Sequence, residues 1–412
     1  MKKNILFSAL LLGALVSCKK KDFLEKPPID PTVKLEYSKL SVEEHKKTLE
    51  TSGVNFLGKI NTLPNEKFIA VISRLAELDL ELLSNSVVGK QLLSSSLAAK
   101  GKNVDAIFSA VTSTNTGVKS GSLNEFYGIY TWDPKTSQFT KTASKDKLEI
   151  SYPATEASKT NNAILTASYT ASKATATVDG TAYELPATVK ATLTVDQKKE
   201  LELNSQYEFN ADGTPLKSNI ELTLGSFALN VKLSNDLKAI NSTVAFLKGT
   251  ETLFAIVASG NGNGNLNAIK EATRFDEVLQ NANAGIRIMN LQLAGQIDVK
   301  AISAATKAAE KLPEAEKSKK KAEAYANNTI LMAFYTTDNT IIAKSDFVSV
   351  EDTYSYWGWD PITNKSVEKK VTYYEVEPRL VFQDGSKLSL KAFFKVGFSK
   401  LIGDFEAYAN RF

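Results

Sequence analysis

The side chains that most often catalyse reactions or bind metals are scarce in this chain. Among 412 residues there is one histidine, His45, and one cysteine, Cys18. Metal sites with two histidines, Cys/His zinc sites and internal disulfides each need more than one such residue, so we expect no metal and no cofactor. A Ser-His-Asp or Cys-His catalytic centre could use only His45. That residue lies among charges in Glu43-Glu44-His45-Lys46-Lys47, which favours a solvated helix position.

Four aromatic residues near the C-terminus are the best candidates for binding: Tyr354, Tyr356, Trp357 and Trp359. Alternate side chains of a strand point to opposite faces, so the tyrosines would share one face and the tryptophans the other. Exposed rings of this kind can stack on sugars or anchor a partner protein. The alternative is that both faces are buried in a core.

A glycine-rich segment from Ser259 to Asn265 follows an apolar run and precedes a predicted helix. That is the setting of a Rossmann phosphate loop, which has the pattern Gly-x-Gly-x-x-Gly. The spacing does not fit, because the third glycine would fall on Asn265 or Asn267. We therefore expect a mobile connecting loop and no bound nucleotide.

The charges give no nucleic-acid signature. The net charge is +4, from 50 basic and 46 acidic residues, and only five of the basic residues are arginine. Arginine supplies the planar fork that recognises phosphate and guanine. The lysine run from Lys317 to Lys321 lies among glutamates, as on a solvated helix face. We expect no nucleic-acid partner.

The first eighteen residues carry the most specific signal in the chain. Lys2 and Lys3 precede an apolar stretch from Ile5 to Val16, which is too short to span a bilayer. Leu15-Val16-Ser17-Cys18 closes that stretch. The arrangement resembles the lipobox signal of bacterial lipoproteins.

The resemblance implies that residues 1–17 are a signal peptide, and that the peptidase cuts before Cys18, which carries the lipid. In Gram-negative lipoproteins an aspartate just after the cysteine commonly retains the protein in the inner membrane. Lys19 stands there in this sequence, so the resemblance implies an outer-membrane lipid anchor, with the body facing the periplasm or the cell surface. Residues 18–36, with lysines and three prolines, are expected to form an extended tether.

The body is predicted to have an α+β fold, in which N-terminal amphipathic helices pack on a curved, mainly antiparallel β-meander. Residues 37–122 are predicted to be helical, because Ser41 and Glu44 form a capping-box pattern and apolar residues from Phe68 onward recur at helical spacing. Residues 123–265 alternate apolar and polar side chains between turn dipeptides such as Asp179-Gly180 and Asp212-Gly213, which predicts consecutive hairpins.

Residues 266–412 are predicted to mix helices and strands, and residues 123–412 could form one sheet domain. We expect helices over 266–282 and over 299–327 with a break at Pro313, strands over 286–297 and 329–396, and a final amphipathic helix over 398–408. Trp132-Asp133-Pro134 recurs as Trp359-Asp360-Pro361. The two copies indicate either two similar hairpin turns or an old duplication.

Three functions remain open from the sequence. The first is a non-enzymatic lipoprotein of the outer membrane with a binding or structural role in the cell envelope; its partners would be the membrane, through acylated Cys18, and an envelope protein or a glycan. The second is a carrier or sensor of an apolar ligand in a cavity between sheet and helices. The third is a glycosidase or peptidase of the envelope that uses two carboxylates.

Overall fold

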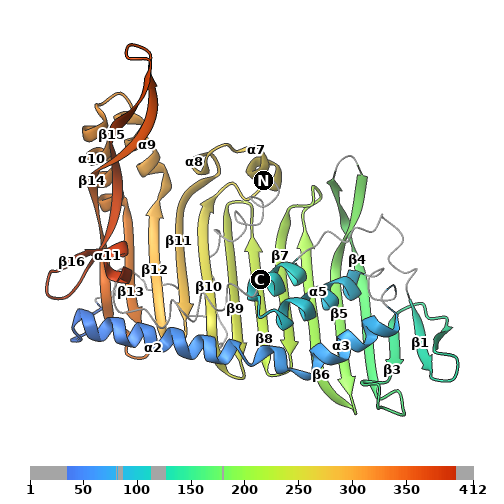
Figure 1. Ribbon diagram of the computed structural model, residues 1–412. Coiled ribbons are helices and arrows are strands. Elements are labelled where there is room, and N and C mark those ends of the chain that lie inside the picture. The colour runs from blue at the N-terminus through green and yellow to red at the C-terminus, as the bar shows by residue number, and fades with distance from the viewer. Residues whose placement is uncertain (1–34, 80, 82–86, 113–126, 179–180, 396–412) are drawn as a thin grey trace.

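The computed structural model describes residues 35–79, 81, 87–112, 127–178 and 181–395. The chain has an α+β fold, as predicted, with helices first and a large sheet after them (Figure 1). The signal peptide, most of the tether, the Asp179-Gly180 dipeptide and the predicted C-terminal helix over 398–408 lie outside the described residues. The N-terminal helices are α2 (Val42–Ile60), a short 3₁₀ turn (Leu63–Asn65), α3 (Lys67–Leu78), α5 (Val87–Lys100) and α6 (Val104–Thr112).

In the described residues sixteen strands form one sheet, and from β3 onward each strand pairs with the next one in the sequence. Every pairing is antiparallel except that of β1 with β3, which is parallel. In chain order the strands are β1 (Gly128–Asp133), β2 (Gln138–Thr142), β3 (Leu148–Tyr152), β4 (Ala163–Val178), β5 (Thr181–Val195), β6 (Lys198–Phe209), β7 (Pro215–Leu224), β8 (Phe227–Asn235), β9 (Ala239–Lys248), β10 (Glu251–Gly262), β11 (Leu279–Ile288), β12 (Leu291–Asp298), β13 (Thr329–Tyr335), β14 (Ile341–Asp360), β15 (Lys365–Val381) and β16 (Lys387–Ser389).

One face of the sheet is buried beneath the first helices. Leu203, Leu222, Leu229 and Phe246 lie directly opposite one another in four successive strands, and each is at most 1% exposed. Their neighbours along each strand point to the other face and are largely polar, which is the alternation seen in the sequence. The alternating pattern therefore predicted both the strands and the covered face.

Helix α3 supplies much of that cover. Phe68, Val71, Ile72 and Leu75 recur at helical spacing, are all buried, and belong to the same core as the sheet residues. Helix α2 begins at the predicted capping box: the Ser41 backbone amide donates to Glu44 Oε2 at 2.8 Å, and the Glu44 amide donates to Ser41 Oγ at 3.4 Å. Both helix predictions are confirmed.

The prediction for His45 is wrong. Its side chain is 2% exposed, and Nδ1 lies 2.8 Å from the hydroxyl of Tyr335. The two rings stack with centroids 5.6 Å apart. Burial lowers the pKa of His45. His45 also stacks on Phe382, and the neighbouring Lys46 places its ammonium over the ring of Phe393, so His45 is a structural residue that joins α2 to a small second core around Phe382 and Phe393.

The glycine-rich segment is mostly strand, and only residues 263–265 form a connecting loop. Strand β10 continues through Gly262, and Gly260 pairs with Ala282 of β11. A Cβ atom at Gly262 would collide with the carbonyl oxygen of Val278, and one at Gly260 would collide with the Leu279 side chain. The glycines thus allow β10 and β11 to approach closely, which is a packing reason that a single sequence does not show.

The single helix predicted over residues 266–282 is not present. Two short helices, α7 (Leu266–Glu271) and α8 (Phe275–Val278), replace the long one, because residues 279–282 already belong to β11. The next pair, α9 (Val299–Ala309) and α10 (Glu314–Asn328), matches the prediction, and Pro313 caps α10. The described chain ends in α11 (Leu390–Lys395).

The two Trp-Asp-Pro copies form the same hairpin turn. The amide of Ser137 donates to the Asp133 carbonyl at 2.9 Å, and that of Asn364 donates to the Asp360 carbonyl at 2.9 Å. Ser137 and Asn364 both have positive φ, 54° and 56°. The local reading, two similar turns, is confirmed. Whether they descend from a duplication stays open.

In the described part of the chain no helix is both long enough and apolar enough to cross a membrane.

Candidate functional site

The outer halves of β14 and β15 form a two-stranded ribbon, which we call the arm (residues 351–374). Its strands are in register from Glu351 opposite Tyr374 to Asp360 opposite Lys365. Figure 1 shows it rising beyond the rest of the sheet. Helix α10 supports the strands just before the arm, where Tyr325 stacks on Phe347 and Ser318 bonds to Ser349. Past that support, residues 351–357 are all exposed.

The arm carries all four predicted binding aromatics, and all four are exposed to solvent. The exposed fractions are 54% for Tyr354, 45% for Tyr356, 72% for Trp357 and 59% for Trp359. Ile362, at the turn, is 92% exposed. The alternative in which both faces form a core is therefore wrong, because the strand extends past the packed layers and no other layer in the described residues covers either face of it.

The tyrosine face of the arm is internally packed. Tyr354 lies 6.2 Å from Tyr356 and 5.9 Å from Tyr373, measured between ring centroids. The hydroxyl of Tyr373 donates to Asp352 Oδ2 at 2.8 Å. That bond raises the pKa of Tyr373 and lowers the pKa of Asp352. Contacts across the two strands stiffen the ribbon, which alone would be marginally stable in water.

On the tryptophan face of the arm the two indoles do not pack on other described rings. Trp357 lies opposite Glu368, and Trp359 lies opposite Ser366. Neither indole stacks on another ring among the described residues. The remaining side chains of this face are Thr353, Ser355, Lys370 and Thr372, with Glu351 and Tyr374 bonded to each other at its base. Two bare indoles are thus surrounded by hydrogen-bonding groups.

The equivalent tryptophan of the other hairpin is not bare. Trp132 lies opposite Phe139, and the rings meet edge to face with centroids 5.1 Å apart. Trp132 also packs against the main core. The same turn therefore holds a tryptophan in a structural contact at one end of the sheet and an exposed one at the other.

The start of the body and the tip of the arm lie at opposite ends of β14. The amide of Ser38 donates to the carbonyl of Ile341, and the amide of Ile341 donates to the carbonyl of Glu36, both at 2.8 Å. Ile341 is the first of the 20 residues of β14, and Asp360 is the last. At about 3.3 Å per residue, some 60 Å of strand separates the two points.

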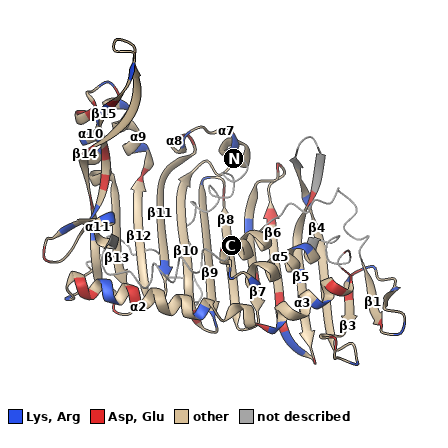
Figure 2. Ribbon diagram, viewed as in Figure 1, with Lys and Arg blue, Asp and Glu red and all other residues tan. Residues whose placement is uncertain are grey.

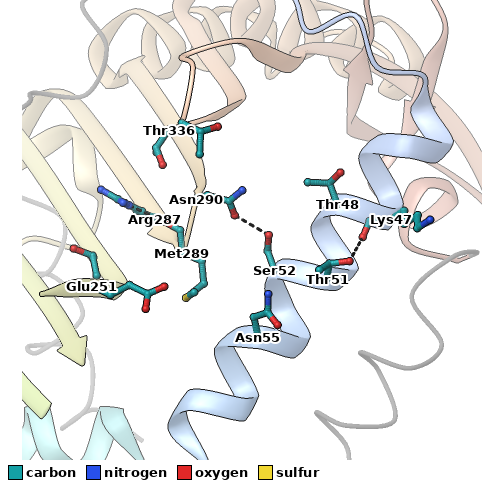
Figure 3. Close-up of a pocket in the computed structure, with 12 residues that line it drawn as sticks. Lys47, Thr48, Thr51, Ser52, Asn55, Glu251, Arg287, Met289, Asn290 and Thr336 are labelled. Atoms are coloured by element: carbon teal, nitrogen blue, oxygen red, sulfur yellow. Dashed lines mark hydrogen bonds between the residues drawn. The ribbon is translucent and has the colours of Figure 1, made fainter. Parts of the chain in front are cut away.

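A second candidate site is a pocket of about 600 Å³ beside α2. Figure 3 shows one polar face of that helix opposite residues of β10, the β11–β12 turn and the β13–β14 turn. Ser52 Oγ donates to Asn290 Oδ1 at 2.7 Å across it. The lining is mostly hydroxyl, amide and charged groups: Lys47, Thr48, Thr51, Ser52, Asn55, Glu251, Thr252, Arg287, Met289, Asn290, Thr336 and Thr337.

The two charged groups on the sheet side of this pocket differ in their partners. Glu251 is paired with Lys59. Arg287 donates from Nε to the Met289 carbonyl at 2.8 Å, and no described carboxylate forms an ion pair with it. Burial lowers the pKa of Arg287. The pocket suits a small polar ligand better than an apolar one. The pocket was not predicted from the sequence. The signal that could have indicated it is the polar stripe of α2 at helical spacing, formed by Thr48, Thr51, Ser52 and Asn55.

The carboxylates whose pKa is shifted most clearly by ion pairs or hydrogen bonds have lowered pKa values. No three His, Cys, Asp or Glu side chains in the described ranges could hold a metal. Asp276 receives bonds from Ser303, Lys307 and Arg274, which hold its pKa well below its usual range. The pKa of Asp346 is lowered by its bond from Lys387. A glycosidase acid needs the opposite shift, a raised pKa.

Charges are interspersed along the elements in the view of Figure 2, with no separate basic face visible. No protein-family model matches the chain, and neither a curated protein nor a solved structure shows significant similarity to it.

Proposed function

We propose that this protein is a lipid-anchored lipoprotein of the outer membrane with a non-enzymatic binding role in the cell envelope, and that the arm is its binding surface. The observation that carries the proposal is the set of exposed rings on a projecting ribbon. Exposed aromatic side chains that gather on one element are typical of interaction sites, because water hydrates their faces poorly.

The position of the arm supports the same role. The tether that follows Cys18 would join the body near Ile341, and the arm tip lies some 60 Å further along β14. A protein anchored at Cys18 would therefore hold the arm away from its own attachment point, where a partner elsewhere in the envelope can reach it. The lowered pKa values of Asp276 and Asp346 give no support to the carboxylate enzyme.

A small-molecule carrier is the second candidate function, favoured by the pocket beside α2. Its lining contains Arg287, Asn290 and several hydroxyls, so the ligand would be polar rather than the apolar one suggested by the sequence. This function is the second candidate because the pocket is open to solvent and its polar side chains are compatible with water. The indoles of the arm are apolar rings exposed to water, and they would gain more from a partner.

Thiol labelling tests whether the arm is covered by a partner. Cys18 is the only cysteine and is acylated in this proposal, so an introduced cysteine supplies the one free thiol. Ser366→Cys places it beside Trp359, and Thr140→Cys is the matched control on the second strand of the other Trp-Asp-Pro hairpin. We expect Ser366→Cys to react with a maleimide about tenfold more slowly in washed envelopes than after purification in detergent. The control should react equally in both.

Equal labelling of Ser366→Cys in envelopes and in detergent would mean that the arm is bare in the envelope, and the proposed function would be wrong.

A further inference from the structure

We propose that the tryptophan face of the arm binds peptidoglycan, whose strands are chains of pyranose rings with N-acetyl groups and peptide carboxylates. This inference rests on the proposed function, since it names the partner of the same surface. It commits to the cell-wall glycan rather than to a lipid bilayer or a protein.

The two indoles offer neighbouring stacking surfaces on one strand face, so they can bind consecutive or nearby rings of a sugar chain. Trp357 and Trp359 are two residues apart on one strand face, so their Cα atoms lie about 7 Å apart. They are 72% and 59% exposed, and no ring among the described residues stacks on either. A pyranose presents a face of C–H groups with hydroxyls at its rim. Such a face covers an indole while its rim stays available for hydrogen bonds.

The side chains around the indoles supply those hydrogen bonds. Ser355 and Ser366 carry hydroxyls, Glu368 lies opposite Trp357, and Lys370 lies opposite Ser355. A bilayer would have to desolvate Glu368 and Lys370 at a considerable cost in free energy. A sugar chain instead exchanges hydrogen bonds with them, so the polar surroundings favour a glycan over a membrane.

The charges of the arm leave one lysine of the tryptophan face, Lys370, available to the acidic peptide stems. The arm has four carboxylates and three lysines, and the two carboxylates at its base, Glu351 and Asp352, accept bonds from the hydroxyls of Tyr374 and Tyr373. A third carboxylate, Asp360, accepts hydrogen bonds within the turn from the amide of Ile362 and the hydroxyl of Thr363. Lys365 and Lys369 lie on the tyrosine face, opposite Asp360 and Tyr356, so Lys370 is the lysine that can pair with a peptide carboxylate on the tryptophan face.

Cosedimentation with purified sacculi tests this assignment. The full-length lipidated chain, solubilised in mild detergent, should pellet with sacculi. The double variant Trp357→Ala/Trp359→Ala should bind about tenfold or more weakly, while Trp132→Ala should bind like the wild type. Because the arm rings pack on little, the double variant should keep the melting temperature of the wild type, and this shows that it is folded.

Fluorescence gives an independent readout. In the Trp132→Phe variant, Trp357 and Trp359 are the only tryptophans of the chain. Soluble disaccharide-peptide fragments released from sacculi should reduce acrylamide quenching of this variant. Unchanged quenching at fragment concentrations that compete for sacculus binding would contradict the assignment.

The inference and the proposed function can fail separately. If Ser366→Cys is protected in envelopes but the chain does not pellet with sacculi, another partner covers the arm and the glycan assignment is wrong. Binding to vesicles of phosphatidylethanolamine and phosphatidylglycerol that depends on Trp357 and Trp359, without binding to sacculi, would likewise overturn it in favour of a lipid surface. Equal sacculus binding by the double variant and the wild type would also overturn it.

Discussion

Cys18→Ser should abolish acylation and remove the protein from the outer-membrane fraction. The lipid is expected on the only cysteine of the chain, and several acyl chains on one residue are what make such an anchor stable. The measurement is metabolic labelling with a fatty acid, followed by density-gradient separation of the two membranes. We expect essentially all of the wild-type protein, and none of the variant, to carry label in the outer membrane.

Two control variants make this result specific. Ser17→Ala keeps a small residue before the cysteine and should leave labelling and location unchanged. Lys19→Asp should keep the label but move the protein to the inner membrane, because the resemblance implies that the residue after the cysteine decides the destination. A Cys18→Ser chain that still carried label in the outer membrane would contradict the lipid anchor.

Phe68→Ala should lower the free energy of unfolding by about 3–5 kcal/mol. The Phe68 side chain is fully buried between α3 and the sheet, within the main core. Its removal leaves a cavity that the surrounding strands cannot close. Urea unfolding followed by far-ultraviolet circular dichroism would measure the change as a shift of the transition midpoint.

Trp357→Ala is the matched control for that measurement. It also removes a large ring, but one that is 72% exposed, so the change in the free energy of unfolding should stay within about 0.5 kcal/mol. A loss at Trp357 as large as the loss at Phe68 would mean that the arm is packed against something in the isolated protein, contrary to the structure.

Local patterns were sufficient to predict most of the elements. The alternation around Leu203 and Leu222 predicted strands with one buried face, and the spacing from Phe68 to Leu75 predicted α3, because each pattern follows from the geometry of a single element. The capping box at Ser41 was equally local. These predictions did not require knowledge of what lies across the sheet.

The errors come from contacts between distant residues. His45 is buried because Tyr335, 290 residues away, packs on it, and nothing near His45 in the sequence indicates this. Gly260 and Gly262 lie in a strand because the start of β11 passes close to them, whereas a cluster of glycine and asparagine residues usually indicates a loop. The pocket beside α2 is likewise formed by turns from far along the chain.

The candidate binding site was predicted only in part. The order Tyr354, Tyr356, Trp357, Trp359 fixed which rings share a face, since that depends on strand geometry alone. Their exposure depended on where the neighbouring strands end: β13 stops pairing with β14 at Lys344, and no local pattern marks that point. The same limit applies to Trp132 and Trp359, which share a motif and a turn but differ in what lies across the hairpin.

Photo-crosslinking in living cells tests the central claim most directly, namely that the arm touches the cell wall. A benzophenone amino acid would replace Trp357 in one strain and Trp132 in another, and the cells would be irradiated. The account predicts that the chain with the probe at position 357 remains with the sacculus in hot detergent and is released by a muramidase, while the chain with the probe at position 132 is extracted. Full extraction of both chains, or a crosslink at position 357 that the muramidase does not release, would contradict it.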